Sequence, residues 1–209
     1  MDILTHLLNQ LYSWDCGCLL LINGHHSSFL DVFMMLVSNK WVWVPFYVLV
    51  SSVIWLKKGW QSAVACLVLI GLTTVLADQL SSQLLRPLIG RMRPSNLNNP
   101  LSAFIHVVNG YRGGAYGFPS SHAANTAGMA FFLIYEFRKR WLFWLMASWV
   151  ALVCYSRMYL GVHYPSDILA GICLGCLCSY AIIISFESLC KVAKNVWRVS
   201  FNSLYLRTI

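Results

Sequence analysis

Long apolar segments separated by short polar ones are the feature of this sequence that most restricts its fold. Five such segments cover residues 41–56, 60–85, 122–137, 141–155 and 167–187. About 20 consecutive apolar residues are enough to cross the hydrocarbon layer of a membrane as a helix. Charged residues make up only 11% of the chain, against about 25% in soluble domains. The pattern therefore predicts an all-α, multi-span transmembrane helical bundle.

The first forty residues are harder to assign. Two apolar pieces, residues 4–23 and 27–38, are separated by a short polar stretch that contains Gly24 and His25. They fit either an interfacial helix followed by a short span or one broken span. We therefore expect five or six spans in a single membrane-embedded domain, residues 1–209.

Positive charge between the segments predicts the orientation in the membrane. Basic residues occur at 57–58, at 138–140 and in a tail that holds Lys191, Lys194, Arg198 and Arg207. If the spans alternate, all of these fall on one side, which the positive-inside rule assigns to the cytoplasm. We expect a multi-pass protein of the inner (cytoplasmic) membrane. The net charge of +8 does not indicate nucleic-acid binding, because the basic residues form short clusters rather than one polar face.

Two polar segments, residues 86–119 and 156–166, then lie on the opposite, periplasmic or extracellular side. They hold no lysine but five arginines: Arg86, Arg91, Arg93, Arg112 and Arg157. Positive charge is disfavoured on that side, so topology does not explain the cluster. Arginine is suited to bidentate binding of phosphate, whereas snorkelling at the interface would explain any one of them alone. The cluster indicates an anion-binding site.

Three short motifs lie in and next to these polar segments. They are R-x6-RP at residues 86–94, PSSH at residues 119–122 and SR-x5-H-x3-D at residues 156–167. The set resembles the type 2 phosphatidic acid phosphatase superfamily, whose members share their site with vanadium haloperoxidases and carry K-x6-RP, PSGH and SR-x5-H-x3-D. The third motif matches in full. Arg86 stands where the family has Lys, and Ser121 stands where it has Gly.

The third motif carries the residues suited to nucleophilic chemistry. Pro165 is placed like the first residue of a helix, so that His163 precedes the helix and Asp167 lies in its first turn. A carboxylate there can accept the Nδ1–H of the imidazole and leave Nε2 free to attack phosphorus. A histidine and an aspartate that only cap a helix would give the same local pattern. The resemblance implies that His163 forms a phosphohistidine intermediate and that Asp167 orients it.

The other two motifs supply hydrogen-bond donors and charge. Ser120 is placed as the N-cap of an apolar helix whose free N–H groups form an anion site. His122 beside that anion could protonate the departing oxygen, although simple capping would also explain this motif alone. The resemblance implies that the phosphate oxygens are bound by Arg86, Arg93, Ser120, Ser121 and Arg157.

The expected activity is a metal-independent hydrolysis without cofactors, because the chain has only seven Asp and Glu and Asp167 is the sole acid in the motifs. The resemblance implies that the substrate is a membrane lipid phosphate or diphosphate of the cell envelope. Undecaprenyl diphosphate comes first, because a small protein with an outward-facing site resembles bacterial undecaprenyl diphosphate phosphatases, and lipid A, phosphatidylglycerophosphate and phosphatidic acid are the alternatives. An anion transporter is the alternative of another class, but its ionisable groups would lie near the bilayer centre rather than at span ends. Vanadate-dependent oxidation ranks last, because the haloperoxidases are soluble.

Four residues keep more than one interpretation. Asp78 is an acid inside an apolar segment, and we expect it to pair with an arginine or a polar neighbour. Arg91, His106 and Arg112 could bind a second phosphate or a sugar headgroup, or could be solvated loop residues. The sequence specifies neither the lipid headgroup nor the oligomeric state.

Overall fold

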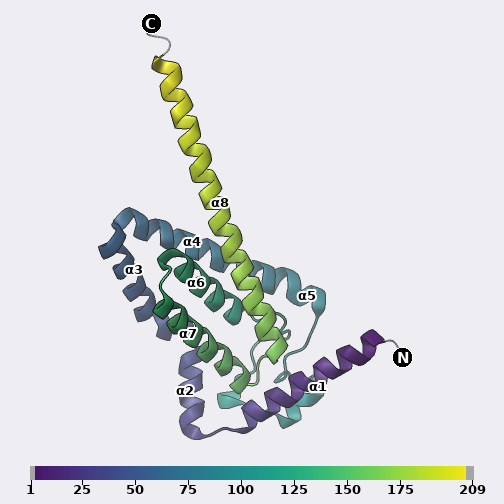
Figure 1. Ribbon diagram of the computed structural model, residues 1–209. Coiled ribbons are helices and arrows are strands. Elements are labelled where there is room, and N and C mark those ends of the chain that lie inside the picture. Colours follow the sequence, from purple (N-terminus) through teal and green to yellow (C-terminus); the bar gives the residue numbers. More distant parts are fainter. Residues whose placement is uncertain (1–2, 206–209) are drawn as a thin grey trace.

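The computed structural model describes residues 3–205, and the side chains of residues 5–192. This part of the chain is helical and has no strand, which confirms the all-α class (Figure 1). The α-helices are α1 (Ile3–Gly24), α2 (Ser28–Ser38), α3 (Val44–Lys58), α4 (Trp60–Gln79), α5 (Arg86–Ile89), α6 (Ser121–Phe137), α7 (Arg140–Tyr159) and α8 (Pro165–Tyr205). A π-helical turn, Leu80–Leu85, joins α4 to α5, and short 3-10 turns occupy Lys40–Trp43, Pro100–Phe104 and Val108–Gly110.

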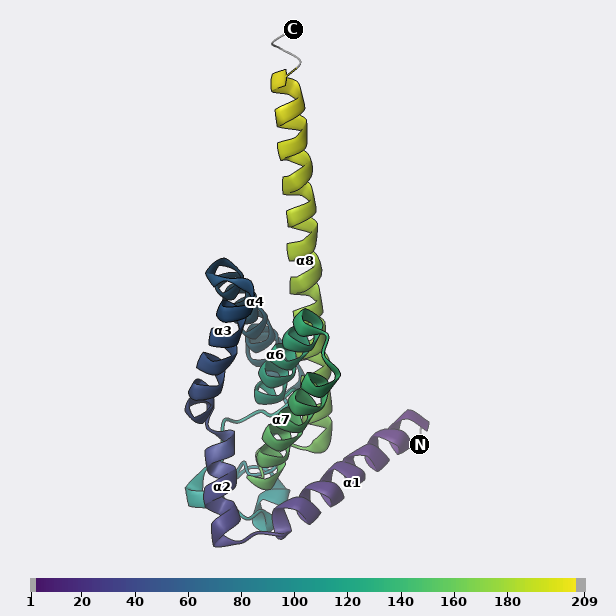
Figure 2. The same cartoon turned by 60° about the vertical axis from the view of Figure 1, so that its left-hand side comes forward.

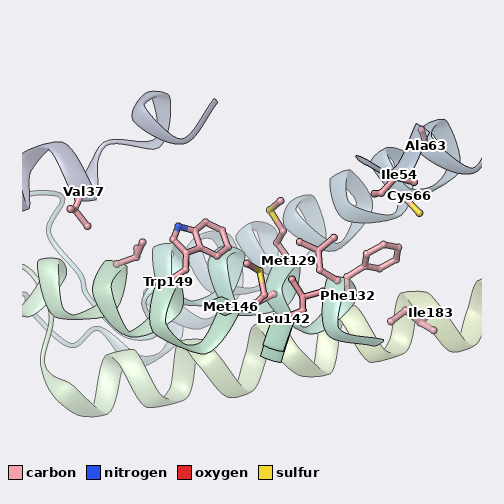
Figure 3. Packing of buried hydrophobic residues seen from close by; sticks show 13 residues of the cluster. Val37, Ile54, Ala63, Cys66, Met129, Phe132, Leu142, Met146, Trp149 and Ile183 are labelled. Atoms are coloured by element: carbon pink, nitrogen blue, oxygen red, sulfur yellow. The ribbon is translucent and has the colours of Figure 1, made fainter. Parts of the chain in front are cut away.

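Helix α6 is the central element of the bundle and packs against α4, α7 and α8. Figure 3 shows side chains of α6 and α7, among them Met129, Phe132, Met146 and Trp149, meeting inside the bundle. Helix α3 completes this cluster with Ile54, which is only 1% exposed. Apolar side chains thus fill the interior of the bundle away from the polar loops.

Small residues bring α6 and α8 into close contact. A Cβ atom at Gly175 would lie 2.0 Å from the carbonyl oxygen of Ala124, and one at Gly171 would lie 2.5 Å from that of Ser120. Backbones approach this closely only where side chains are absent or small. The contact fixes the first turn of α6 beside the first turn of α8, where the second and third motifs lie.

Within the described part of the chain, three helical stretches are long and apolar enough to cross a membrane: Trp60–Ile89, Arg140–Tyr159 and Pro165–Val192. Helices α1 and α2 pass the same test only as a pair that is bent by 118°. Helices α3 and α6 were also expected as spans. They have 15 and 17 residues and are shorter than these three stretches. The number of five or six spans therefore stays a prediction.

The two basic turns that were expected on one side of the membrane lie at one end of the bundle. Lys58 at the end of α3 forms an ion pair with Glu136 near the end of α6. The sequence led us to expect that the last apolar segment ends near residue 187. Helix α8 instead continues past the bundle as one helix (Figures 1 and 2). Of the basic tail, the side chains of Lys194 and Arg198, and all of Arg207, lie outside the described part of the structure.

Candidate active site

His163 lies in the turn between α7 and α8, with 0% of its surface exposed. Its Nε2 atom is 3.0 Å from Nη1 of Arg93. A guanidinium group can only donate, so Nε2 accepts this hydrogen bond and the ring proton belongs on Nδ1. Nδ1 faces Oδ2 of Asp167 at 3.5 Å, which is longer than a hydrogen bond. The contacts thus favour the tautomer that nucleophilic attack from Nε2 requires.

Both carboxylate oxygens of Asp167 have partners, and the residue is 0% exposed. Oδ2 accepts the backbone N–H of Tyr164 at 2.9 Å, and Oδ1 accepts Nη1 of Arg91 at 2.9 Å. Gly117 packs against this group, because a Cβ atom there would lie 3.0 Å from Oδ2. The carbonyl oxygen of Asp167 accepts the N–H of Ser120 at 3.0 Å. Asp167 therefore joins the third motif to the second.

Three guanidinium groups lie around His163: those of Arg93 and Arg157 are buried, and that of Arg86 is half-buried. Arg93 donates from Nε to the carbonyl of Tyr116 at 3.0 Å and from Nη1 to that of Val162 at 3.1 Å. Arg157 donates to the hydroxyl groups of Ser38 and Tyr111, and Arg86 donates to Pro119 O and to the hydroxyl of Ser121. The Nε atoms of Arg86 and Arg157 are buried without a partner. Buried donors without partners are costly, and a bound anion would satisfy them.

The electrostatic environment of His163 keeps its imidazole neutral. Burial lowers the pKa of His163 well below its ordinary value of 6.5, and the charges of Arg93, Arg157 and Arg86 lower it further. Burial, and then the neighbouring Arg86 and Arg157, also lower the pKa of Arg93, to about 10. Arg93 therefore stays protonated at neutral pH, while His163 has a free lone pair. The site combines a neutral nucleophile with an excess of positive charge.

The second motif contributes the N-terminus of α6. Ser120 is the N-cap, as the sequence predicts, and its Oγ accepts the N–H of Ala123 at 3.4 Å. The first intrahelical hydrogen bond runs from Ala124 N to Ser120 O. The preceding N–H groups, those of Ser121 and His122, are of the kind that bind anions at helix starts.

A cavity of about 520 Å³ begins beside Ser121 and His122 and runs between α3, α4, α6 and α7. Its far walls are largely apolar and include Tyr47, Ile54, Ile70, Met129 and Trp149. The ring of His122 makes no hydrogen bond to the described residues, so a bound molecule could engage it. The polar site and an apolar chamber are thus continuous at His122.

The structure brings the predicted site residues of all three motifs to one end of the bundle. His106 and Arg112, which the sequence left without a definite role, have other partners. His106 pairs with Asp31 at 3.0 Å, and Arg112 donates to the carbonyl of Ser95 at 2.7 Å. The carboxylate of Asp78 lines the cavity, and it forms no ion pair with any described residue, unlike the pairing that was expected.

Arg91 is a residue whose place the sequence left open. It is neither a solvated loop residue nor directed at the phosphate site, because it bridges Asp167 and Asp15. Asp15 was not singled out at all. The one signal for it was an acid inside an apolar segment, which is a functional candidate by default.

Comparison with known proteins identifies the family to which this site belongs. The model of the PAP2 superfamily matches residues 62–189. The chain belongs to the PAP2 superfamily. It is therefore a membrane lipid phosphatase, a phosphoric ester hydrolase of the PAP2 type, as the motifs indicate.

Relatives in this superfamily act on several lipids. The chain is 47% identical over 169 residues to a lipid A 4'-phosphatase of Bacteroides thetaiotaomicron, covering 81% of this chain and 75% of the relative. It is 37% identical to a lipid A 4'-phosphatase of Porphyromonas gingivalis, with 78% and 69% covered. Identity to an undecaprenyl-diphosphatase of Sulfolobus acidocaldarius is 27%, with 79% and 73% covered.

Solved structures show the same fold. The PAP2-type phosphatidylglycerolphosphate phosphatase of Bacillus subtilis superposes with a TM-score of 0.60 at 24% identity, covering 86% of this chain and 88% of the other. The LpxE protein of Aquifex aeolicus gives a TM-score of 0.59 at 22% identity, with 80% and 93% covered. The PAP2 fold thus extends over most of this chain.

Proposed function

We propose that this PAP2 protein releases inorganic phosphate from the headgroup of lipid A, at its 4' position, through a phosphohistidine on His163. The observation that carries the chemistry is a neutral, buried imidazole among guanidinium groups with unpaired donors. The 47% identity to a lipid A 4'-phosphatase favours lipid A. This reverses the order expected from the sequence, which placed undecaprenyl diphosphate first.

The first step forms a bond between Nε2 of His163 and phosphorus while the bond from phosphorus to the lipid oxygen breaks. Nη1 of Arg93, now 3.0 Å from Nε2, turns its hydrogen bond to a phosphate oxygen and frees the lone pair. Nε of Arg86, Nε of Arg157 and the first N–H groups of α6 bind the other oxygens, with the hydroxyl groups of Ser120 and Ser121 at the same helix start. Charge that spreads over these oxygens in the transition state is stabilised without reorganisation.

His122 acts on the other face of the phosphorus. The negative charge of the bound phosphate lets its ring take up a proton. His122 donates this proton to the departing lipid oxygen in the first step and accepts a proton from water in the second. The water oxygen then bonds to phosphorus as the Nε2–phosphorus bond breaks, which releases phosphate and restores neutral His163. Asp167 compensates the positive charge that the ring carries in the intermediate. No step needs a metal ion, because the arginines supply the positive charge.

The cavity beside His122 supports a substrate that keeps its chains in an apolar environment. At about 520 Å³ it has room for part of an acyl chain, and Ser121 and His122 of the polar site form part of its lining. We propose that the site faces the periplasmic side of the inner membrane, opposite the basic turns at the ends of α3 and α6. An anion transporter is disfavoured, because the arginines and histidines cluster at helix ends.

A panel of lipid phosphates tests this function. Phosphate release would be measured in detergent with a chelator present, on lipid A, undecaprenyl diphosphate, phosphatidylglycerophosphate and phosphatidic acid. We expect turnover in chelator, fastest on lipid A, and none by His163→Ala. Preference for undecaprenyl diphosphate would restore the first expectation, and no release from any of the four would refute the phosphatase proposal. Release without a gradient separates an enzyme from a transporter.

A further inference from the structure

A carboxylate from α1 reaches the back of the active site. Helix α1 lies across the ends of α7 and α8 (Figures 1 and 2). Most of its side chains are exposed, but Asp15 is only 7% exposed. Oδ1 of Asp15 accepts the N–H of Ser166 at 2.9 Å, and Oδ2 accepts the hydroxyl of the same serine. Asp15 precedes the region that the family model matches, and no motif points to it.

Arg91 connects this carboxylate to Asp167. Its Nη2 atom is 2.6 Å from Oδ2 of Asp15, and its Nη1 atom is 2.9 Å from Oδ1 of Asp167. Nη1 also donates to the hydroxyl of Ser166 at 2.5 Å, and the guanidinium lies 4.0 Å above the ring of Tyr164. Each end of the guanidinium is therefore held by an acid, and its plane rests on an aromatic ring.

The two oxygens of Asp167 have different tasks in this arrangement. Oδ1 is held by Arg91, while Oδ2 accepts the N–H of Tyr164 and faces Nδ1 of His163. A carboxylate fixed at one oxygen cannot rotate freely about its last bond. Arg91 on Oδ1 and the N–H of Tyr164 on Oδ2 thus together set the direction of Oδ2.

We propose that Asp15 and Arg91 are a positioning pair for Asp167, which makes α1 a working part of the active site. The inference rests on the proposed role of His163 as nucleophile. Asp15 orients Arg91, Arg91 holds Asp167, and Asp167 faces the Nδ1–H that the hydrogen bond from Arg93 to Nε2 favours. Neither Asp15 nor Arg91 touches the substrate, so the pair acts on the rate of phosphoryl transfer and not on phosphate binding.

Kinetic constants of Asp15→Asn, Arg91→Gln and Arg91→Lys test the pair, with lipid A as substrate and orthovanadate as inhibitor. Loss of an outer partner of a catalytic group typically costs about 10- to 100-fold. We expect kcat to fall by about that factor in Asp15→Asn and further in Arg91→Gln, while KM and the inhibition constant of vanadate stay close to those of the wild type. Arg91→Lys should restore part of the loss, since it restores the charge.

Two further readouts separate positioning from general destabilisation. Combining Asp15→Asn with Arg91→Gln should be no worse than Arg91→Gln alone, because Asp15 acts through Arg91. The low-pH limb of kcat/KM should move to higher pH in Arg91→Gln, because a carboxylate that has lost its cation is protonated more easily. The matched control is Asp31→Asn, which removes an ion-paired acid of the neighbouring helix α2 that does not contact Asp167.

The Nδ1–H proton of His163 gives a test that needs no turnover. In protein labelled with ¹⁵N at histidine, its chemical shift should be the same in the wild type and in Asp31→Asn, and should move upfield in Asp15→Asn, where Asp167 is held less firmly. Unchanged kcat and an unchanged Nδ1–H shift in Asp15→Asn would overturn the positioning pair, and so would equal losses in Asp31→Asn. Absence of lipid hydrolysis by the wild type would instead refute the proposed function, while the Nδ1–H shift would still decide the role of Asp15 and Arg91.

Discussion

Two pairs of histidine and aspartate occur among the described residues, and the one with the better hydrogen bond is not the one that we propose for catalysis. His106 Nε2 lies 3.0 and 3.1 Å from the two oxygens of Asp31, whereas His163 Nδ1 lies 3.5 Å from Asp167. The side chains of the first pair are 28% and 22% exposed, and those of the second are fully buried. Distance alone would select His106 and Asp31 rather than the pair that we propose for catalysis.

The surroundings of each pair explain the difference. His106 stacks on His26 with ring centroids 3.7 Å apart, and Asp31 also accepts the hydroxyl of Tyr159 at 2.6 Å. These contacts join the long loop to α2 and α7, so the pair has a structural role. His163 instead presents Nε2 to Arg93, and the nearby Arg86 and Arg157 each keep an Nε atom without a partner among the described residues. The surroundings of the ring nitrogen that faces away from the aspartate thus distinguish the proposed nucleophile, and the length of the contact with the aspartate does not.

The largest expected effect comes from removing each histidine in turn. We expect His163→Ala to lower kcat by at least about 10⁴-fold, because a covalent route that loses its nucleophile has no substitute. We expect His106→Ala to retain kcat within about threefold and to cost about 1 kcal/mol of stability, as a half-exposed pair does. Phosphate release and thermal unfolding in detergent measure both. Comparable losses of kcat in the two variants would break the distinction.

Replacing Asp167 should lower kcat far more than replacing Asp31, as with the two histidines. Asp167→Asn keeps the shape of the side chain but no longer compensates the charged ring, and a misplaced proton on His163 costs about 10²- to 10⁴-fold in kcat. Asp31→Asn should change kcat by less than about threefold and mainly loosen the loop. Steady-state rates on one substrate test this. A mild Asp167→Asn phenotype would mean that the 3.5 Å contact does no work in the reaction.

The sequence predicted the parts of the site that are local, and it missed those that depend on distant packing. The spacing of His163 and Asp167 and the cap at Ser120 are set within single turns of helix, so short motifs describe them. The bridge from Asp15 through Arg91 joins residues 76 positions apart, and no local pattern encodes it. The continuation of α8 past residue 187 was missed because that segment becomes polar where the helix leaves the bundle.

A smaller effect should follow from adding one methyl group behind the catalytic pair. At Gly117 a Cβ atom would lie 3.0 Å from Oδ2 of Asp167, 3.3 Å from Cγ of Arg93 and 3.6 Å from Nδ1 of His163. We expect Gly117→Ala to push these groups apart and to lower kcat by about 10- to 100-fold, as small misplacements of catalytic groups do. Gly114→Ala in the same loop is the matched control, because nothing lies within 4 Å of its Cβ position. Equal activity of the two variants would show that the pair tolerates displacement.

The smallest effect concerns the dependence of stability on pH, which follows from the burial of His163. Because burial and the arginines hold the pKa of His163 well below 6.5 in the folded protein, the unfolded chain takes up a proton below pH 6.5 that the folded protein does not. Stability is therefore lost as the pH falls from 6.5, at up to about 1.4 kcal/mol per pH unit from this residue. His163→Gln removes that contribution. Its free energy of unfolding should fall less steeply than that of the wild type between pH 6.5 and 5, and in parallel with it above pH 7. Curves that stay parallel down to pH 5 would mean that the folded site already accommodates a protonated His163, and the contrast with the exposed pair would then lose its electrostatic basis.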